Sequence, residues 1–206
     1  MYRSLMALNT HRLRLAVDSC IDNYFAVFHG VLAPETAGVF SRFSEGLDFR
    51  PSNSLVVPQS FEHFGFYEGD WPEEIGWLVE QTEAIVTARA RARARHGLMR
   101  WRVNDVAIQR YSKPEDGIGW HRDFARDHHL VAIYSVIGEC DLGIRNRDGV
   151  HLEYRVLPRA LTLLSGPDPI SGHDPRLQHR VGPPLTDEPR ISIALRMNAV
   201  PRCADY

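Results

Sequence analysis

Cysteine is scarce in this 206-residue chain, and it has no long apolar run. Cys20, Cys140 and Cys203 form no C-x-x-C pair, which argues against a disulfide framework and against a cysteine zinc site. No segment reaches the apolar length of a membrane span, and the charged N-terminal stretch does not have the pattern of a secretion signal. We therefore expect a cytoplasmic protein with no membrane partner.

Lysine is also scarce, and the chain has no net basic charge. Lys113 is the only lysine, all other basic residues being arginine, and the formal net charge is -2. A chain with this balance has no global basic field, so sequence-independent attraction to nucleic acid is not expected from the whole molecule. No Gly-rich phosphate loop, internal repeat or low-complexity linker divides the chain, and its 44% hydrophobic residues suffice for a substantial core. We expect one domain over residues 1–206.

The first half of the chain has helical patterns and one long irregular stretch. We predict a strand at residues 25–28 and a helix that begins at Pro34, because proline favours the first helical turn and apolar residues follow at helical spacing. Residues 51–75 are rich in proline, glycine and aromatic side chains without a clean period, which indicates a long excursion with hairpin character. A second helix is predicted at residues 77–96, with Gly97 as its stop.

After Gly97 the chain alternates short apolar runs with turn residues. The runs are DVAIQRY, LVAIYSVIG, DLGIRN, HLEYRVLP, ALTLLSG and RISIALRM. Several short strands at such intervals are typical of a β-sandwich or barrel. The predicted fold class is therefore α+β and mainly β, with a helical region at residues 1–100 and a β core at residues 101–200.

A possible metal site starts in the stretch GWHRDFARDHH, residues 119–129. His121 and Asp123 are two apart, so in an extended backbone both side chains lie on one face and can reach a single ion, while Arg122 points away. On its own, this pair is equally consistent with an exposed strand end. His179, shortly before the run RISIALR, supplies a second histidine, and two histidines with one carboxylate form the facial triad of non-haem Fe(II) oxygenases.

Two arginines lie on one face of the predicted last strand. Arg190, Ser192 and Arg196 share that face by strict period 2, opposite to the isoleucines and the leucine of the same run. The arginines could pair with protein carboxylates or lie at a sheet edge. Two guanidinium forks just after a candidate metal ligand instead suit a small dicarboxylate, whose oxygens they can bind bidentately. This pattern favours 2-oxoglutarate as a co-substrate.

Four stretches together resemble the AlkB-type Fe(II)- and 2-oxoglutarate-dependent dioxygenases: IQRYSKPEDGIGWHRD, YSVIGECDLGIRN, LLSGPDPISGHDPRLQHRV and RISIALR. The resemblance covers residues 105–198 closely, and residues 27–43 are more loosely similar to the family's opening strand and helix. It implies a double-stranded β-helix, or jelly roll, with N-terminal helices and a lid. It also implies an oxidoreductase that uses O2 and 2-oxoglutarate as co-substrates.

The resemblance assigns roles to individual residues. It implies three iron ligands, which are also the catalytic residues: His121, Asp123 and His179. The family's R-x-N/S-x-x-x-R strand matches Arg190, Ser192 and Arg196. Its first arginine is implied to grip the distal carboxylate of 2-oxoglutarate, and its second to lie near the iron-chelating end.

An N-x-Y motif lies upstream of the H-x-D pair in the same family. It corresponds here to Gln109 and Tyr111, and the tyrosine is implied to hydrogen-bond the co-substrate. Gln109 replaces the usual asparagine. Asp123 stands where related halogenases omit the carboxylate, so the resemblance favours hydroxylation or oxidative demethylation over halogenation.

His173 is the alternative to His179 as the distal ligand, since the stretch GHDP also precedes the arginine strand. We favour His179 because Val181 beside it belongs to an apolar, strand-like run, whereas His173 lies in a Gly-Asp-Pro turn. Three polar residues are expected in a loop at the mouth of the site rather than on the metal: Asp127, His128 and His129. Three further histidines are expected to have structural or surface roles: His29, His63 and His151.

The substrate class depends on residues outside the motifs. The best-known members of the family demethylate alkylated nucleobases, with aromatic stacking and basic contacts to the backbone. The excursion at residues 51–75 has aromatic side chains for stacking, namely Phe61, Phe64, Phe66, Tyr67 and Trp71. It also has acids that would repel phosphates, namely Glu62, Glu68, Asp70, Glu73 and Glu74.

The arginines that could compensate for these acids are Arg89, Arg91, Arg93, Arg95, Arg100 and Arg102. They form either a solvated helix face or a phosphate-binding stripe. The resemblance favours demethylation of alkylated nucleobases in single-stranded or damaged DNA or RNA. Hydroxylation of a small molecule or a protein side chain is the alternative.

Overall fold

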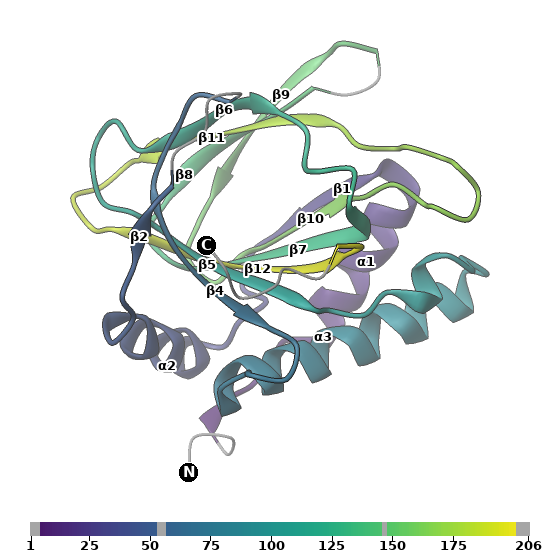
Figure 1. Cartoon of the computed structure of the whole chain (residues 1–206), viewed down its shortest axis with the longest axis horizontal. Coiled ribbons are helices and arrows are strands. Elements are labelled where there is room, and N and C mark those ends of the chain that lie inside the picture. Colours follow the sequence, from purple (N-terminus) through teal and green to yellow (C-terminus); the bar gives the residue numbers. More distant parts are fainter. Residues whose placement is uncertain (1–4, 53–56, 146–147, 201–206) are drawn as a thin grey trace.

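The computed structural model describes residues 5–52, 57–145 and 148–200, and in this part the chain forms two antiparallel β-sheets with helices on one side (Figure 1). The strands of the larger sheet are, in spatial order, β1 (Phe25–Phe28), β10 (Leu161–Ser165), β7 (Asp127–Ile137), β12 (Arg190–Asn198), β5 (Asp105–Tyr111), β4 (Glu62–Tyr67) and β2 (Arg50–Pro51). Those of the smaller sheet are β3 (Gln59–Ser60), β6 (Gly117–His121), β11 (Gln178–Pro184), β8 (Cys140–Arg145) and β9 (His151–Val156). The helices are α1 (Thr10–Asn23), α2 (Pro34–Glu45), α3 (Glu73–Ala92) and the short 3-10 helix η2 (Leu98–Arg100).

The layers follow one another as smaller sheet, larger sheet and helices (Figure 1). The larger apolar cluster lies between the helices and the larger sheet, and includes Leu13 of α1 and Ile193 of β12. The smaller cluster lies between the sheets, where Val131 of β7 meets Leu142 of β8. Because neighbours in a strand face opposite sides, Ser192 points toward the smaller sheet. This arrangement is a jelly roll, so the predicted fold class is confirmed.

Strand β1 and the beginning of α2 lie where the sequence predicts them. Helix α3 instead begins at Glu73, four residues before the predicted start, and ends at Ala92, four residues before the predicted end. Pro72 precedes its first turn, and two acids in that turn complement the helix dipole. The backbone of Ala94 is left-handed, with φ of 51°, so the chain turns away before Gly97.

Helix α1 has no counterpart among the elements predicted from the sequence. Its buried positions are Leu13, Ala16, Val17 and Cys20, which have the spacing of a helix with one apolar face. The side chain of Asn9 caps the helix by accepting a hydrogen bond from the Arg12 backbone at 3.0 Å. The charged residues between the apolar positions hide this period when the stretch is read only for membrane or signal character.

Part of the 51–75 excursion belongs to both sheets. Strand β2 pairs with β4 as the predicted hairpin character suggests, and β4 then pairs along its whole length with β5 in the larger sheet. Strand β3 pairs with β6 in the smaller sheet. Residues 53–56 of the excursion lie outside the described residues. The excursion therefore closes one side of the jelly roll, next to the strands that carry the predicted site.

Two further features bear on the compartment predictions. Cys20 and Cys140 are buried free thiols, and Cys203 lies outside the described residues. Within the described ranges, no helix combines the length and the apolar composition that crossing a membrane requires.

Candidate metal centre

The pairing of β6 with β11 brings three potential metal ligands together. His121, the last residue of β6, lies opposite His179 of β11 in the sheet register, and Asp123 follows two residues after His121. One ligand atom from each of the three lies within 4.8 Å of the others. His179 Nε2 is 3.8 Å from Asp123 Oδ1, and the two imidazole rings have centroids 4.2 Å apart. The three donors form the set that a facial triad requires.

Backbone carbonyls orient both imidazoles so that Nε2 can coordinate a metal. His121 Nδ1 donates to the Gly119 carbonyl at 2.8 Å, and His179 Nδ1 faces the Leu177 carbonyl at 3.4 Å. Because each carbonyl can only accept, Nδ1 carries the proton and Nε2 is left with its lone pair for a metal. Burial lowers the pKa of His121, and His179 acts in the same direction, which favours the neutral ring that a metal needs.

Arg176 fixes the backbone at the third donor. Its Nη1 donates to the Asp123 carbonyl at 2.7 Å, while the same guanidinium binds the Asp174 carboxylate through Nε and Nη2. Asp174 therefore has a pKa of about 2. Sequence reasoning missed Arg176, because no local pattern signals a contact between residues 53 positions apart.

Arg190 begins β12 and faces the interior between the sheets. It is 4% exposed, its guanidinium carbon lies 4.9 Å from the Tyr111 ring centroid, and Nη2 donates to Ser135 Oγ at 3.3 Å. Within the part of the chain that the structure describes, Nε and Nη1 of Arg190 have no hydrogen-bond partner. A buried cation with two unpaired donors is costly, and a carboxylate from a ligand would satisfy both donors. Ser135 was not predicted as part of the site.

Gln109 and Tyr111 lie beside this arginine because β5 pairs with β12. The register places Tyr111 opposite Arg190 and Gln109 opposite Ser192. Gln109 Oε1 accepts from Tyr111 Oη at 3.4 Å and from Ser192 Oγ at 3.3 Å. Burial raises the pKa of Tyr111 to about 12, although Arg190 acts in the opposite direction, so the phenol keeps its proton and can donate. The glutamine thus links the tyrosine to the last strand.

Arg196 has protein carboxylates as neighbours. Its Nη1 lies 3.9 Å from Asp105 Oδ2, and its side chain is 16% exposed. Asp127, expected in a loop at the mouth of the site, instead begins β7 and is 2% exposed. Burial raises the pKa of Asp127 to about 6, against the attraction of Arg196. Arg196 therefore differs from Arg190, because acids already lie around it.

His173 and His129 lie away from the three donors. Among the described residues, the ligand group around His121 and Asp123 contains His179 and not His173. His173 is exposed in the loop between β10 and β11, with its ring centroid 5.9 Å from that of Tyr24. His129 is buried near the start of β7, with Nδ1 3.8 Å from Asp168 Oδ1.

Two arginines of the candidate phosphate-binding stripe, Arg89 of α3 and Arg93 directly after it, pair with acids of α1. Arg89 binds Asp18 of α1 through two hydrogen bonds of 2.9 and 2.7 Å, and Arg93 forms an ion pair with Asp22. The two arginines are four residues apart, as are the two aspartates, so the pairs follow one another along both helices and hold the end of α3 against α1. These helices cover the face of the larger sheet opposite to the smaller sheet (Figure 1).

Solved structures with the same architecture give a comparison for the whole chain. A Pseudomonas putida prolyl-4-hydroxylase matches with a TM-score of 0.67 and 13% identity, over 90% of this chain and 98% of that one. A Trichoplax adhaerens prolyl hydroxylase, solved with a hypoxia inducible factor peptide fragment, matches with a TM-score of 0.69 and 14% identity, over 93% and 90% of the two chains. The chain shares their fold.

A third structure with this fold was solved in complex with a small molecule. The SnoN epimerase of nogalamycin biosynthesis, in complex with Fe3+, α-ketoglutarate and nogalamycin RO, matches with a TM-score of 0.65 and 12% identity, over 93% of this chain and 85% of that one. No protein-family model and no curated protein matches the sequence. The likeness to these three structures therefore extends across the fold, and it does not single out the AlkB type.

Proposed function

We propose that this protein is an Fe(II)- and 2-oxoglutarate-dependent oxygenase that hydroxylates a small molecule or a protein side chain. The observation that carries the proposal is the convergence of His121, Asp123 and His179 at the end of β6 and the start of β11. The fold comparison supports it, since the similar structures are prolyl hydroxylases and an epimerase. The substrate of this chain belongs, on this proposal, to the same broad classes of peptide and small molecule.

The residues present fit both groups that the proposed reaction needs. Three donors would hold the iron, which with 2-oxoglutarate and O2 supplies the oxidation of an unactivated C–H bond. Arg190 would bind the distal carboxylate of 2-oxoglutarate through its unpaired Nε and Nη1. Tyr111 would turn its O–H away from Gln109 and donate a hydrogen bond to the same ligand. The burial of Arg190 keeps water away from this contact and strengthens it.

The aromatic residues of the 51–75 excursion support hydroxylation over nucleobase demethylation. Phe61 stacks on Tyr111 with ring centroids 5.3 Å apart. Phe64 contacts Phe66 at 5.0 Å, and both Phe66 and Trp71 pack against the larger apolar cluster. These rings are engaged within the protein, so fewer are left to stack on an extruded base. The ion pairs of Arg89 and Arg93 remove two of the cations expected for phosphate contacts.

Succinate formation tests the proposed reaction. The purified chain with Fe(II), O2 and 2-oxoglutarate should release succinate, and a substrate from a panel of amino acids, peptides and metabolites should accelerate the release. His121→Ala and Asp123→Ala should abolish it, while His173→Ala should leave it unchanged, because His173 is outside the ligand group. Full turnover in the His121→Ala variant would refute the assignment of the metal site.

A further inference from the structure

A cavity of about 630 Å³ lies on the helix side of the larger sheet, where α1 and α3 end. Its walls come from the last turn of α1, the turn after α3, the start of β7, the end of β10 and the loop between β10 and β11. None of the three potential metal ligands lines it. Its volume is in the range of sites that bind small organic molecules.

The walls of this cavity are mostly apolar, and their polar side chains include three histidines: His96, His129 and His173. Val17, Cys20 and Leu130 are buried there and belong to the larger apolar cluster, against which Ile21 and Leu98 also pack. Burial raises the pKa of the Cys20 thiol to about 12, so this sulfur is neutral. A ligand lying along these walls would need an apolar body.

The one carboxylate that lines the described cavity already has hydrogen-bond donors within the protein. Asp168 accepts hydrogen bonds from the Ile170 backbone and the Ser171 hydroxyl, both at 2.9 Å, and lies near His129. It also packs tightly against Gly97, where an added Cβ would lie 2.8 Å from its Oδ2. Asp168 is therefore held against the turn after α3. Although burial acts in the opposite direction, the hydrogen bonds from Ile170 and Ser171 lower the pKa of this carboxyl, so it keeps a negative charge that its own donors stabilise.

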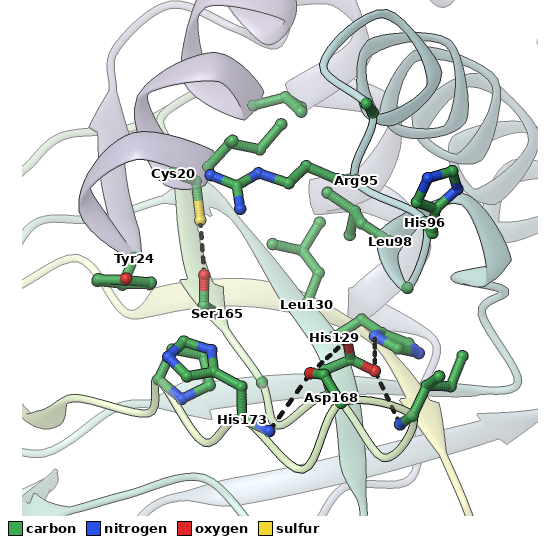
Figure 2. A pocket seen from close by; sticks show the side chains of 18 residues that line it. Cys20, Tyr24, Arg95, His96, Leu98, His129, Leu130, Ser165, Asp168 and His173 are labelled. Atoms are coloured by element: carbon green, nitrogen blue, oxygen red, sulfur yellow. Dashed lines mark hydrogen bonds and ion pairs between the residues drawn. The ribbon is translucent and has the colours of Figure 1, made fainter.

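Arg95 carries the opposite charge at an exposed position and has no such partners within the described part of the protein. Figure 2 shows its side chain extending from the turn after α3 across the cavity toward Cys20. Its guanidinium makes no hydrogen bond or ion pair with any residue that the structure describes, unlike Arg89 and Arg93 of the same series. The backbone N–H of Arg95 bonds the Ala90 carbonyl at 2.8 Å, which satisfies part of the negative end of α3.

We propose that this cavity is a second binding site, for a small organic anion with an apolar body. The anionic group, a carboxylate or a sulfonate, pairs with Arg95, and the body lies against Val17, Ile21 and Leu98. Charge complementarity selects the head group, and the apolar walls select the remainder of the ligand. This site is independent of the proposed metal and co-substrate site.

Calorimetric titration of the full chain with 4-phenylbutyrate tests the proposal, with 4-phenylbutanamide as the neutral analogue. We expect the acid to bind at low millimolar concentration or below, and the amide to bind about tenfold more weakly, since hydrogen bonds to charged groups contribute about 1.5–3 kcal/mol. Arg95→Gln should reduce the affinity for the acid to that for the amide. Arg91→Gln is the matched control, because Arg91 is exposed near the same helix end but does not line the cavity.

Two further measurements place the bound acid. Ile21→Trp should fill the cavity and abolish binding, with an unchanged circular dichroism spectrum showing that the variant is folded. Excess 2-oxoglutarate should not displace the acid, and His121→Ala should bind it normally, so a failed oxygenase assay leaves this result intact. Absence of binding, equal affinities for acid and amide, equal losses in Arg91→Gln and Arg95→Gln, or displacement by 2-oxoglutarate would each overturn the proposal.

Discussion

Arg190 is a buried cation whose guanidinium is only partly hydrogen-bonded within the described part of the protein. A buried guanidinium with two unpaired donors is tolerated only where a ligand or solvent completes it, and the guanidinium fork matches a carboxylate. Ser135 and Tyr111 hold the arginine from two other strands of the same sheet, so its position does not depend on a ligand. This preorganisation is what a co-substrate anchor requires.

Replacing this anchor should affect co-substrate binding more than the subsequent reaction. For Arg190→Gln we expect the 2-oxoglutarate concentration for half-maximal succinate release to rise about tenfold or more, because charge-assisted hydrogen bonds are lost. The maximal rate at saturating 2-oxoglutarate should fall much less. Arg42→Gln, at an exposed position of α2, is the control and should leave both quantities unchanged. An unaltered requirement in Arg190→Gln would place the anchor elsewhere.

Asp127 gives a prediction about stability and pH. Its pKa is about 6 in the folded chain and about 3.8 when exposed, so the folded state favours the protonated form. Its contribution to stability is therefore complete below about pH 4 and is lost as pH rises through 6. At about 1.4 kcal/mol per pKa unit, the loss is on the order of 3 kcal/mol.

Asp127→Asn removes this titration while keeping the shape of the side chain. Urea unfolding of the metal-free protein should show the variant to be more stable than the parent at pH 8, by up to about 3 kcal/mol, and nearly equal at pH 4. Asp187→Asn, at an exposed site, should show no such pH dependence. A difference that is the same at both pH values would mean that Asp127 does not titrate as described.

At the scale of elements, side chains on the outer face of the smaller sheet pack across the pairing of β6 with β11. Trp120 directly precedes His121, and Arg180 directly follows His179. Because neighbours in a strand face opposite sides, both side chains lie on the face of the sheet opposite to the histidines. The Arg180 guanidinium lies 5.6 Å from the Trp120 ring centroid and binds Glu153 of β9 at 2.6 Å. Gly143 of β8 leaves the space for this packing, since a Cβ there would lie 2.8 Å from Arg180 and 2.9 Å from Trp120.

Gly143→Ala should therefore disturb the sheet that carries the candidate ligands. We expect a loss of about 1–3 kcal/mol in the free energy of unfolding, measured with urea, and weaker Fe(II) binding, because Trp120 and Arg180 must shift beside the histidines. Gly76→Ala is the matched control. An added Cβ meets nothing within 4 Å there, and alanine should stabilise α3 by roughly 0.5–1 kcal/mol. Stability equal to the parent in Gly143→Ala would contradict this account.

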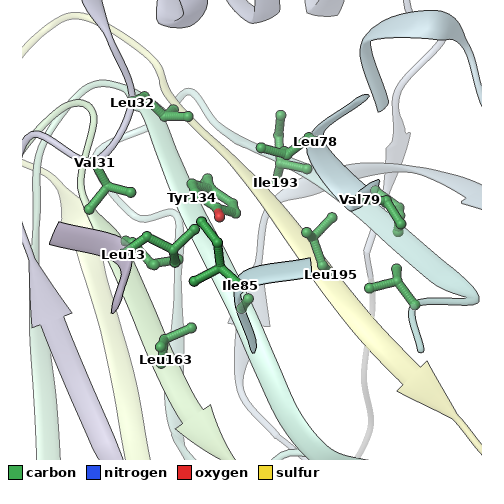
Figure 3. Packing of buried hydrophobic residues seen from close by; sticks show 14 of the residues in the cluster. Leu13, Val31, Leu32, Leu78, Val79, Ile85, Tyr134, Leu163, Ile193 and Leu195 are labelled. Carbon is green, nitrogen blue, oxygen red and sulfur yellow. The ribbon is translucent and has the colours of Figure 1, made fainter. Parts of the chain in front are cut away.

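The helices illustrate which elements local sequence can reveal. Helix α2 has a proline at its first turn and apolar residues at helical spacing, so its start was predictable. Helix α1 has the same kind of apolar period, but its charged residues obscured it, and its stability comes from packing of Leu13 with Val31, Tyr134 and Leu163 (Figure 3). The end of α3 depends on the left-handed backbone of Ala94, for which the sequence carries no glycine or asparagine signal.

For the molecule as a whole, metal binding should be coupled to folding. The proposed ligands come from two strands and a following loop that meet only in the folded state, so a metal that binds there stabilises that state. Fe(II) under anaerobic conditions, at about 100 times its dissociation constant, contributes about 2.7 kcal/mol. For a domain of this size, this should raise the midpoint of thermal unfolding by roughly 5–10 °C.

The histidine variants make this measurement specific. His179→Ala should lose the thermal shift, and His173→Ala should keep it, because His179 and not His173 lies with His121 and Asp123. An equal shift in both variants would mean that Fe(II) binds outside the proposed centre. Addition of a chelator should reverse the shift in the parent protein.

The arrangement of charge over the molecule also bears on the substrate. The ion pairs of Arg89 and Arg93 lie between α1 and α3, on the face of the larger sheet opposite to the candidate metal centre. We therefore expect no strong, steeply salt-dependent binding of a methylated single-stranded oligonucleotide in a fluorescence anisotropy titration. Tight binding that falls with salt would favour nucleobase demethylation instead.

The sequence by itself determined the elements of this protein whose signals are local. Alternation along RISIALR predicts that Arg190 and Ser192 share one face, and the H-x-D spacing predicts that His121 and Asp123 do so, because side-chain direction follows from backbone geometry. Tertiary structure alone decided which distant groups meet these residues. The sequence already favoured His179 over His173, but the meeting of His179 with His121 and Asp123, and the contacts from Arg176 and Ser135, depend on strand register and loop paths. Such contacts between residues far apart in the chain have no local pattern, since packing of the whole molecule sets them.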